Sequence, residues 1–160
     1  MFNVRVYGIL LNENDDVLVS DELIRGNRYT KFCGGGMEKG EGTIDCLIRE
    51  FKEEMDLQIE VIQHIYTTDF FQQSAFNPAH QLISIYYQVK AVEPLKVEIK
   101  KKTFDFDETH LQKHQETGQA EVFRFVPWAE FDAEILSFPI DKVVADLVKK
   151  RNGLLKKTVF

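Results

Sequence analysis

The sequence has few cysteines and no long apolar run. Its 160 residues include only two cysteines, Cys33 and Cys46, which gives neither a disulfide framework nor a zinc-binding spacing, so we expect two free thiols in or near the core. No apolar run approaches the ~20 residues that a membrane-spanning helix needs. The N-terminus also lacks a basic start followed by an apolar stretch. We therefore expect no signal peptide, no membrane partner and, by default, a cytoplasmic location.

Basic side chains are fewer than acidic ones, 20 against 26. The formal net charge is −6, and residues 38–56 alone carry seven acidic and three basic side chains, a local balance of −4. Such a surface repels a nucleic-acid backbone. The one basic run, at 96–102, alternates as a solvated edge strand does, since lysines protect sheet edges. We expect no nucleic-acid partner.

The length and composition suit one folded domain over residues 1–160. Apolar residues make up 44% and charged residues 29% of the chain, which is typical of a globular protein. The α/β (α+β) pattern predicts an α/β/α sandwich around a mixed sheet, with a central and a C-terminal helix. The expected strands are 2–11, its hairpin partner 17–23, 28–33, 57–66, 81–92 and 121–128, and the expected helices are 43–56 and 137–152, with a short helix near Pro127.

The helix at 43–56 combines an apolar stripe with an acidic one. On a helical wheel Glu50, Glu53 and Glu54 lie within about 100° of arc. The adjacent stripe is apolar and faces a core; it consists of Ile44, Leu47, Ile48, Phe51 and Met55. Like charges at these spacings repel by a few tenths of a kcal/mol per pair. Taken alone, such a stripe is most simply a solvated acidic face.

Three glycines before this helix favour a second interpretation, a cation site. Gly34, Gly35 and Gly36 have no side chains, so their backbone polar groups can approach a ligand closely. Carbonyl and carboxylate oxygens together suit a hard divalent cation such as Mg²⁺, which is commonly shared with substrate phosphates. A carboxylate left free in the cluster is able to act as a general base.

The spacing of these residues resembles the signature of the Nudix hydrolase family, in its MutT-like branch. That signature runs Gly, five residues, Glu, seven residues, Arg-Glu, an apolar residue, any residue, Glu-Glu, any residue, Gly, apolar. Here Gly35, Glu41, Arg49-Glu50-Phe51, Glu53-Glu54 and Leu57 match it. The final glycine is replaced by Asp56. A glycine there ends the helix in a left-handed conformation that aspartate tolerates less well, so an ending in the usual way and a distorted one are both open.

The resemblance implies a role for each matching residue. It implies that Glu53 and Glu54 bind the metal, that Glu50 is a ligand or the base, and that Arg49 orients Glu50. The carbonyl of Gly34 or Gly35 joins the metal shell. Glu41 supports the loop or an outer metal shell, and Gly36 supports the motif. Mg²⁺, with Mn²⁺ as the alternative, is the expected cofactor. No organic cofactor is expected.

The segment 105–121 adds weaker candidates. It has the least regular pattern of the chain and is expected to be a loop at 105–119. "ETGQAE" resembles a late acidic loop of MutT-like members, with Glu116 the first choice for a catalytic carboxylate and Glu121 the second. Ordinary exposed glutamates are an equally good interpretation. His110 and His114 would clasp a metal only if the segment is helical, and two histidines without a third ligand are more often surface residues.

The aromatic residues around 69–76 have two interpretations. Phe70, Phe71 and Phe76 are placed to stack a base, but core packing is the more common use of such side chains.

The resemblance implies an Mg²⁺-dependent pyrophosphohydrolase, an enzyme in which water attacks a phosphorus of a nucleoside triphosphate or a similar nucleoside diphosphate derivative. One alternative is a diphosphatase for ADP-ribose, nucleotide sugars or non-nucleotide substrates. Another is a nucleotide-sensing binding module without turnover. The expected partner is a small phosphorylated molecule, and the expected assembly is a monomer or homodimer.

Overall fold

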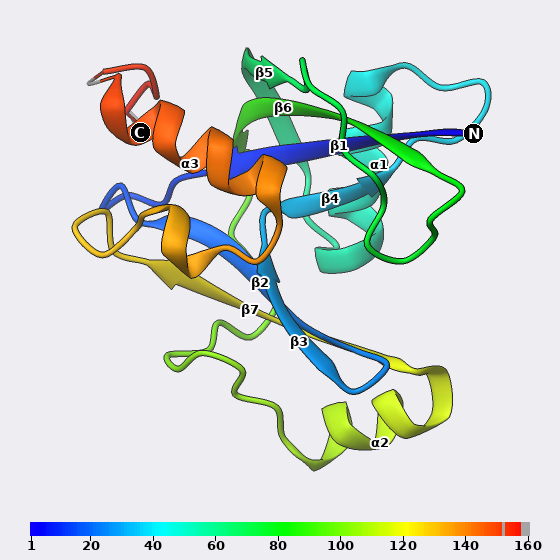
Figure 1. Cartoon of the computed structure of the whole chain (residues 1–160). Coiled ribbons are helices and arrows are strands. Elements are labelled where there is room, and N and C mark those ends of the chain that lie inside the picture. Colours follow the sequence, from blue (N-terminus) through cyan, green and yellow to red (C-terminus); the bar gives the residue numbers. More distant parts are fainter. Residues whose placement is uncertain (152, 158–160) are drawn as a thin grey trace. The chain divides into compact units, whose positions relative to one another are not determined.

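The computed structural model describes residues 1–151 and 153–157 and divides the chain into two compact units (Figure 1). The first unit comprises Met1–Leu10 and Cys33–Lys96, and the second comprises residues 11–32 together with the described residues from Val97 onward. A single domain over 1–160 stays a prediction.

A four-stranded mixed sheet forms the first unit, in the order β4-β1-β6-β5. Its strands are β1 (Phe2–Leu10), β4 (Cys33–Gly36), β5 (Ile59–Thr67) and β6 (Gln81–Ala91). The central strand β1 runs parallel to β6 and antiparallel to β4. This arrangement brings the three glycines of β4 beside the middle of β1.

Helix α1 (Thr43–Met55) packs on this sheet through part of the predicted apolar stripe. Leu47, Phe51 and Met55 are buried. A β-carbon added to Gly8 of β1 would lie 2.9 Å from the Phe51 ring, so the helix approaches the strand more closely than a side chain would allow. The stripe is narrower than predicted, because Ile44 and Ile48 are 45% and 38% exposed.

The end of α1 answers the question raised by Asp56. Asp56 adopts a left-handed conformation (φ 47°, ψ 40°), and its backbone N–H donates to Lys52 O at 2.9 Å. The Asp56 carboxylate also accepts hydrogen bonds from Lys52 and from Lys96. These two lysines lower the pKa of Asp56, with Lys52 contributing most. The helix therefore ends at the expected residue, and cations offset the unfavourable charge.

The second unit contains an antiparallel sheet in the order β3-β2-β7. Its strands are β2 (Val17–Ile24), β3 (Asn27–Lys31) and β7 (Gln119–Val126). Its helices are α2 (Glu108–Thr117), a 3₁₀ turn η1 (Ala133–Ile135) and α3 (Pro139–Lys150). Helix α3 buries the apolar side chains that its period predicts, among them Ile140, Val144 and Val148. The predicted end of this helix at Asn152 lies outside the described residues.

Asp21 of β2 is the most enclosed charge of the second unit, with 0% exposure. Its carboxylate accepts hydrogen bonds from Arg124 Nε (2.6 Å) and Nη2 (3.2 Å). It also accepts from Thr30 Oγ1 (2.7 Å) and from the backbone N–H of Phe104 (3.1 Å). A buried charge is stable only with such partners.

Several local predictions are wrong. The strand at 17–23 does not form a hairpin with β1; apart from a bridge between Leu11 and Val17, β2 pairs with β3 and β7. The basic run at 96–102 is not a strand and only bridges at Ile99 to Phe123. The predicted loop at 105–119 contains α2, which Asp107 caps by accepting from the backbone N–H of His110. Tertiary pairing and a local cap therefore overrode these sequence patterns.

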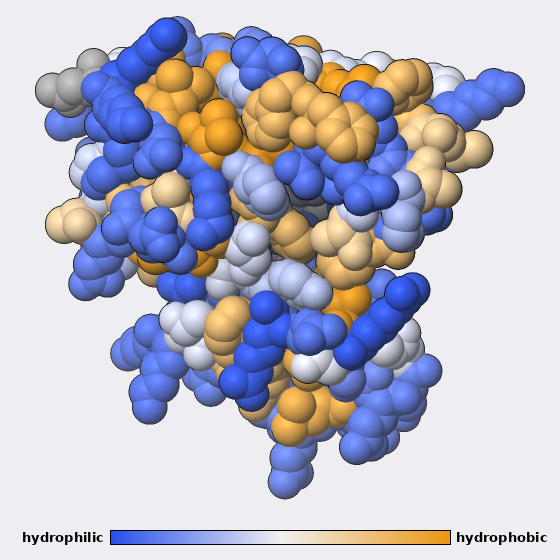
Figure 2. Space-filling view, viewed as in Figure 1, coloured by the Kyte–Doolittle hydropathy of each residue, from blue (hydrophilic) through white to orange (hydrophobic). Residues whose placement is uncertain are grey.

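The predicted fold class is confirmed, since the chain is α+β with a mixed sheet. Both cysteines are buried free thiols, as predicted. Among the described residues no helix is long and apolar enough to cross a membrane. Hydrophilic side chains dominate the face shown in Figure 2, with hydrophobic patches between them.

Candidate active site

Arg49 is the hub of the site in the first unit. Its guanidinium binds Glu41 through two hydrogen bonds, Nε to Oε2 at 3.0 Å and Nη2 to Oε1 at 2.7 Å. Its Nη1 donates to Glu50 Oε1 at 3.0 Å and to Glu53 Oε2 at 3.2 Å. Its Nη2 also donates to the carbonyl of Gly36 at 3.0 Å. One arginine on α1 thus binds three of the glutamates that the sequence singled out and fastens the helix to β4.

The hub changes the ionisation of its members. The hydrogen bonds from Arg49, and then the backbone N–H of Glu38, lower the pKa of Glu41 from 4.5 to about 2. The Glu41 hydrogen bond in turn raises the pKa of Arg49. Burial raises the pKa of the neighbouring Cys46 thiol to about 12. At neutral pH the site therefore holds a fixed carboxylate–guanidinium pair beside a protonated thiol.

Glycine at 35 is needed because Glu50 occupies the space of a side chain. A β-carbon added there would lie 2.3 Å from Glu50 Cδ. At Gly34, φ is +146° and a β-carbon would lie 2.1 Å from Val6 O, so strand pairing excludes any other residue. The Glu50 side chain is only 14% exposed. β4 and Arg49 thus hold the Glu50 carboxylate from two sides.

The remaining glutamates of the motif differ in exposure. Glu53 is 59% exposed in its side chain, whereas Glu54 is half-buried. Among the described residues no group of three or more histidine, cysteine, aspartate or glutamate side chains converges on one point that would hold a metal ion. The contacts explain this, because Glu50 and Glu53 turn toward Arg49.

The late acidic candidates lie in the second unit. Glu116 is exposed on the last turn of α2, where Oε1 accepts from Gln112 Nε2 at 3.3 Å. Glu121 is half-buried on β7, and its Oε2 accepts from Ser20 Oγ at 2.7 Å. Ser20 is fully buried. Glu121 is therefore the more firmly held of the two.

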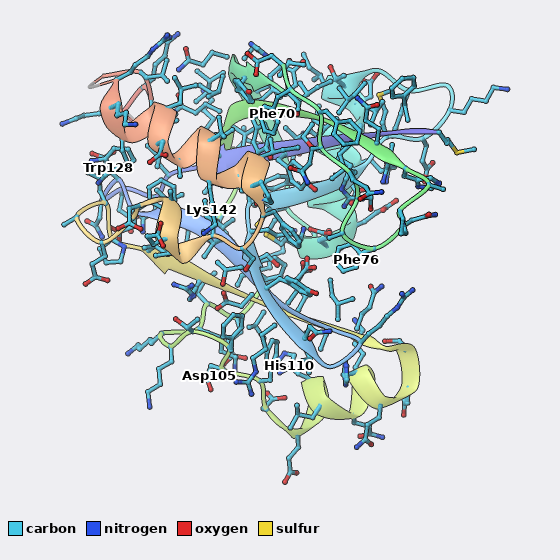
Figure 3. The ribbon with its side chains drawn as sticks, in the orientation of Figure 1. Phe70, Phe76, Asp105, His110, Trp128 and Lys142 are labelled. Atoms are coloured by element: carbon cyan, nitrogen blue, oxygen red, sulfur yellow. The ribbon has the colours of Figure 1, made fainter. Side chains whose placement is uncertain are left out.

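The two histidines of α2 have partners other than a metal. His110 Nδ1 lies 2.7 Å from Asp107 Oδ1 at the start of the helix, and His110 is labelled in Figure 3. His114 Nε2 accepts from the backbone N–H of Gly26 at 3.1 Å. These contacts fasten α2 and provide no metal site.

The aromatic residues between β5 and β6 are not core residues. Phe70, Phe71 and Phe76 are 39%, 71% and 45% exposed, and two of them are labelled in Figure 3. Core packing, the more common use, is therefore wrong for them.

The sequence interpretation did not single out Arg5, which is half-buried in this structure. It lies on β1 directly opposite Gly36. The available sign was a single cation inside an otherwise uncharged strand pattern, since an arginine in a half-buried strand needs a partner or a ligand.

Comparison with known protein families supports the resemblance seen in the sequence. A model of the NUDIX domain matches residues 1–147 of the chain. Among curated proteins no sequence matches significantly.

Many solved structures share the fold at low sequence identity. One is a MutT protein from Methanosarcina mazei Go1, with 12% identity, a TM-score of 0.65 and coverage of 94% of this chain and 95% of the other. Another is a NUDIX hydrolase from Nitrosomonas europaea, with 16% identity, a TM-score of 0.62 and coverage of 94% and 90%. A UDP-X diphosphatase has 13% identity, a TM-score of 0.59 and coverage of 94% and 62%. Identities this low establish a common fold and no more.

Proposed function

The chain belongs to the Nudix hydrolase family, whose members cleave diphosphate bonds in nucleoside diphosphate derivatives, and we propose that it is a Mg²⁺-dependent pyrophosphohydrolase acting on a nucleoside triphosphate or a similar nucleotide. The observation that carries this proposal is the Arg49 hub, in which one guanidinium holds Glu41, Glu50 and Glu53 against the glycine strand. A family that consists of hydrolases disfavours the alternative of a binding module without turnover.

The donor set fits a hard divalent cation in its chemistry. Glu53 and Glu54, with Glu50 and the carbonyl of Gly34 or Gly35, are the proposed ligands, and all of them offer the oxygen donors that Mg²⁺ or Mn²⁺ prefers. Ligation by Glu53 would replace its contact with Arg49. Bound Mg²⁺ supplies charge neutralisation for phosphate oxygens and lowers the pKa of water.

The protein's own contribution is to fix the carboxylates. Glu50, held by Arg49 and by the bare backbone of Gly35, is the proposed ligand or general base, positioned to orient or deprotonate the attacking water. Arg49 is a positioning residue, because it reaches the reaction through Glu50. Glu41 fixes Arg49 in turn. Glu116, or the better-held Glu121, stays the proposed late carboxylate.

The alternative of a diphosphatase for ADP-ribose, nucleotide sugars or non-nucleotide substrates concerns the same chemistry. The likeness to a UDP-X diphosphatase keeps it open without favouring it, since the identity is 13%. A cytoplasmic location, a monomeric or homodimeric state and the absence of nucleic-acid and membrane partners stay predictions from the sequence.

The test is a product-release screen over nucleoside triphosphates, dinucleotides and nucleotide sugars. We expect hydrolysis of at least one class with Mg²⁺, loss of turnover in excess chelator, and recovery on adding Mg²⁺ or Mn²⁺. Full turnover in excess chelator would contradict the proposed requirement for a divalent metal. If no substrate class were hydrolysed, the proposed pyrophosphohydrolase activity would be wrong.

A further inference from the structure

A pocket of about 260 Å³ lies in the first unit, where the parallel strands β1 and β6 start side by side (Figure 1). Its lining includes Phe2, Phe71 and Gln81. The described residues that line it include no lysine, arginine, aspartate or glutamate. The N-terminal ammonium group of Met1, beside the pocket, donates to the carbonyl of Ala79 at 3.1 Å. The pocket therefore presents aromatic and neutral polar groups.

The pocket lies on the sheet face that carries α1. A β-carbon on Gly8 of β1 would meet the Phe51 ring of α1, and β1 pairs with β6 without a register shift. Side chains alternate between the two faces of a strand, so Phe2, six residues from Gly8, projects from the same face. Gln81 is the strand partner of Phe2, and Gln73 bridges to Gln81 from the other side. Phe2, Gln81 and Gln73 therefore form a row on this face.

Two phenyl rings and one amide in this pocket are available to a ligand. Phe2 and Phe71 are 65% and 71% exposed, and neither ring stacks on another ring of the described residues. The side-chain amide of Gln81 likewise makes no hydrogen bond within the described part of the chain. Gln73 has a structural contact instead, since its Nε2 donates to the carbonyl of Pro78 at 2.9 Å and holds the pocket wall.

Such a lining suits a flat, uncharged ring with polar edges. Nucleobases stack on aromatic side chains whatever their identity, because every base has a π face. A side-chain amide both donates and accepts hydrogen bonds, as the edges of bases do. A phosphate group would find neither a lysine nor an arginine among the described lining residues. The chemistry of the pocket therefore favours a nucleobase over an anion.

The pocket also lies at a suitable distance from the Arg49 hub. Glu50 packs over Gly35, which pairs with Val6 of β1. Val6 is four residues from Phe2 on the same face of the same strand, so the two positions are roughly 13 Å apart. An extended nucleotide spans about this length between its base and its outer phosphates. One face of the sheet thus offers a place for each end of a nucleotide.

We propose that this pocket binds the base of the nucleotide substrate, stacked on Phe71 and Phe2 and hydrogen-bonded to the Gln81 amide. That the base belongs to a substrate rests on the proposed function. That the pocket takes a base rests on its lining and on the face of the sheet where it lies.

The test compares two probes in the presence of Mg²⁺. One is a nucleoside diphosphate whose bridging oxygen is replaced by methylene, with each common base in turn, and the other is methylenediphosphate, which lacks base and sugar. Calorimetry measures their Kd for the wild type, Phe71→Ala and Gln81→Leu. Phe70→Ala is the matched control, because Phe70 is the adjacent aromatic residue and is 39% exposed but does not line the pocket.

We expect the wild type to bind at least one nucleotide probe about 10- to 100-fold more tightly than methylenediphosphate. Phe71→Ala should lose most of this advantage and bind methylenediphosphate unchanged, because the ring contacts the base alone. Gln81→Leu should lose part of the advantage, and Phe70→Ala should keep it. KM for the best nucleotide of the screen should rise with Kd in Phe71→Ala, while kcat changes less than about 3-fold.

A wild type that binds no nucleotide probe more tightly than methylenediphosphate would overturn the proposal. An advantage that persists in folded Phe71→Ala, or that is lost equally in Phe70→Ala, would do the same. Sedimentation velocity tests a second copy of the chain as the occupant. If Phe71→Ala turned a dimer into a monomer and kept the advantage, the pocket would be an interface between copies and the proposal would be wrong.

The same data separate this inference from the proposed function. Binding of a nucleotide probe that depends on Phe71, without hydrolysis of any substrate, would refute the proposed function and leave the base pocket standing. Hydrolysis of nucleotides with no dependence on Phe71 would refute the base pocket and leave the proposed function standing.

Discussion

Arg49 in the first unit and Arg124 in the second each bind carboxylates, but in opposite proportions. Arg124 binds one carboxylate, that of Asp21. The Asp21 carboxylate accepts its other hydrogen bonds from the Thr30 hydroxyl and the backbone N–H of Phe104. Arg49 binds three carboxylates. The Arg124 cluster is therefore balanced in charge, whereas the three carboxylates that accept hydrogen bonds from Arg49 give that cluster an excess of two negative charges.

The Arg124 cluster stabilises the fold, whereas the excess negative charge of the Arg49 cluster fits the proposed cation site. The balanced pair is buried, with Asp21 0% exposed, and needs nothing further. The unbalanced cluster lies partly open, with the Arg49 side chain 22% and the Glu53 side chain 59% exposed. Uncompensated charge at neutral pH costs stability, so a cation that binds there relieves it.

The strongest test of this contrast removes a proposed metal ligand. Glu54→Gln or Glu53→Gln keeps the shape of the side chain and should lower kcat by about 10²- to 10⁴-fold, the usual loss for a ligand or base. For Glu53→Gln the melting temperature should change little, because the Glu53 side chain is 59% exposed and an exposed ion pair contributes at most ~1 kcal/mol. Steady-state kinetics and thermal unfolding measure the two effects.

Glu38→Gln is the control for that experiment. Its side chain is 70% exposed and lies 3.9 Å from Arg49 Nη1, outside the motif. If Glu38→Gln and Glu54→Gln were equally inactive, the measurement would report general surface charge and the proposed site would be wrong.

The balanced cluster should behave in the opposite way. Asp21→Ala leaves Arg124 without its carboxylate, and breaking such a buried pair typically costs about 3–5 kcal/mol. Urea unfolding should show this loss, while kcat per folded molecule changes far less than in Glu54→Gln. Replacing both residues, with Asp21→Leu and Arg124→Met, should recover part of the stability. If the double variant were no more stable than Asp21→Ala, the unpaired charge of Arg124 would not be the cause of the lost stability.

Acid sensitivity sharpens the comparison for Glu41. Its pKa is lowered from 4.5 to about 2, so its ion pair with Arg49 contributes full stability above pH 4.5 and loses it as the pH falls toward 2. Glu41→Gln should be less stable than the wild type at pH 6, and the gap should close on acidification. Unfolding curves at intervals from pH 6 to 2.5 measure this. A gap that stays constant across the range would rule out the ion pair as its source.

The smallest expected effect concerns Asp56. Asp56→Gly favours the left-handed conformation but removes the contacts with Lys52 and Lys96. Since these effects oppose each other, we expect the melting temperature to change by no more than about 4 °C and kcat to stay the same. A large gain in kcat would mean that aspartate distorts the metal site in the native chain.

Local pattern predicted much of the first unit. The helix expected at 43–56 spans Thr43–Met55, and its glutamates lie beside the glycine strand. Both features follow from short-range geometry. The helical period decides which side chains share one face of the helix, and glycines without side chains allow that face to approach the strand closely. Spacing along one helix was therefore enough to group Arg49 with Glu50 and Glu53.

By itself, the sequence determined the fold class, the glutamate helix and the family, because each is encoded in a contiguous pattern. Tertiary structure decided which strands pair: β2 joins β7 rather than β1, and β1 lies between β4 and β6. It also exposed Ile48, formed α2, and set Arg5 opposite Gly36. Contacts between segments far apart in the chain depend on which strands pair and in what register. No single stretch of residues determines that pairing, because it depends on both strands at once.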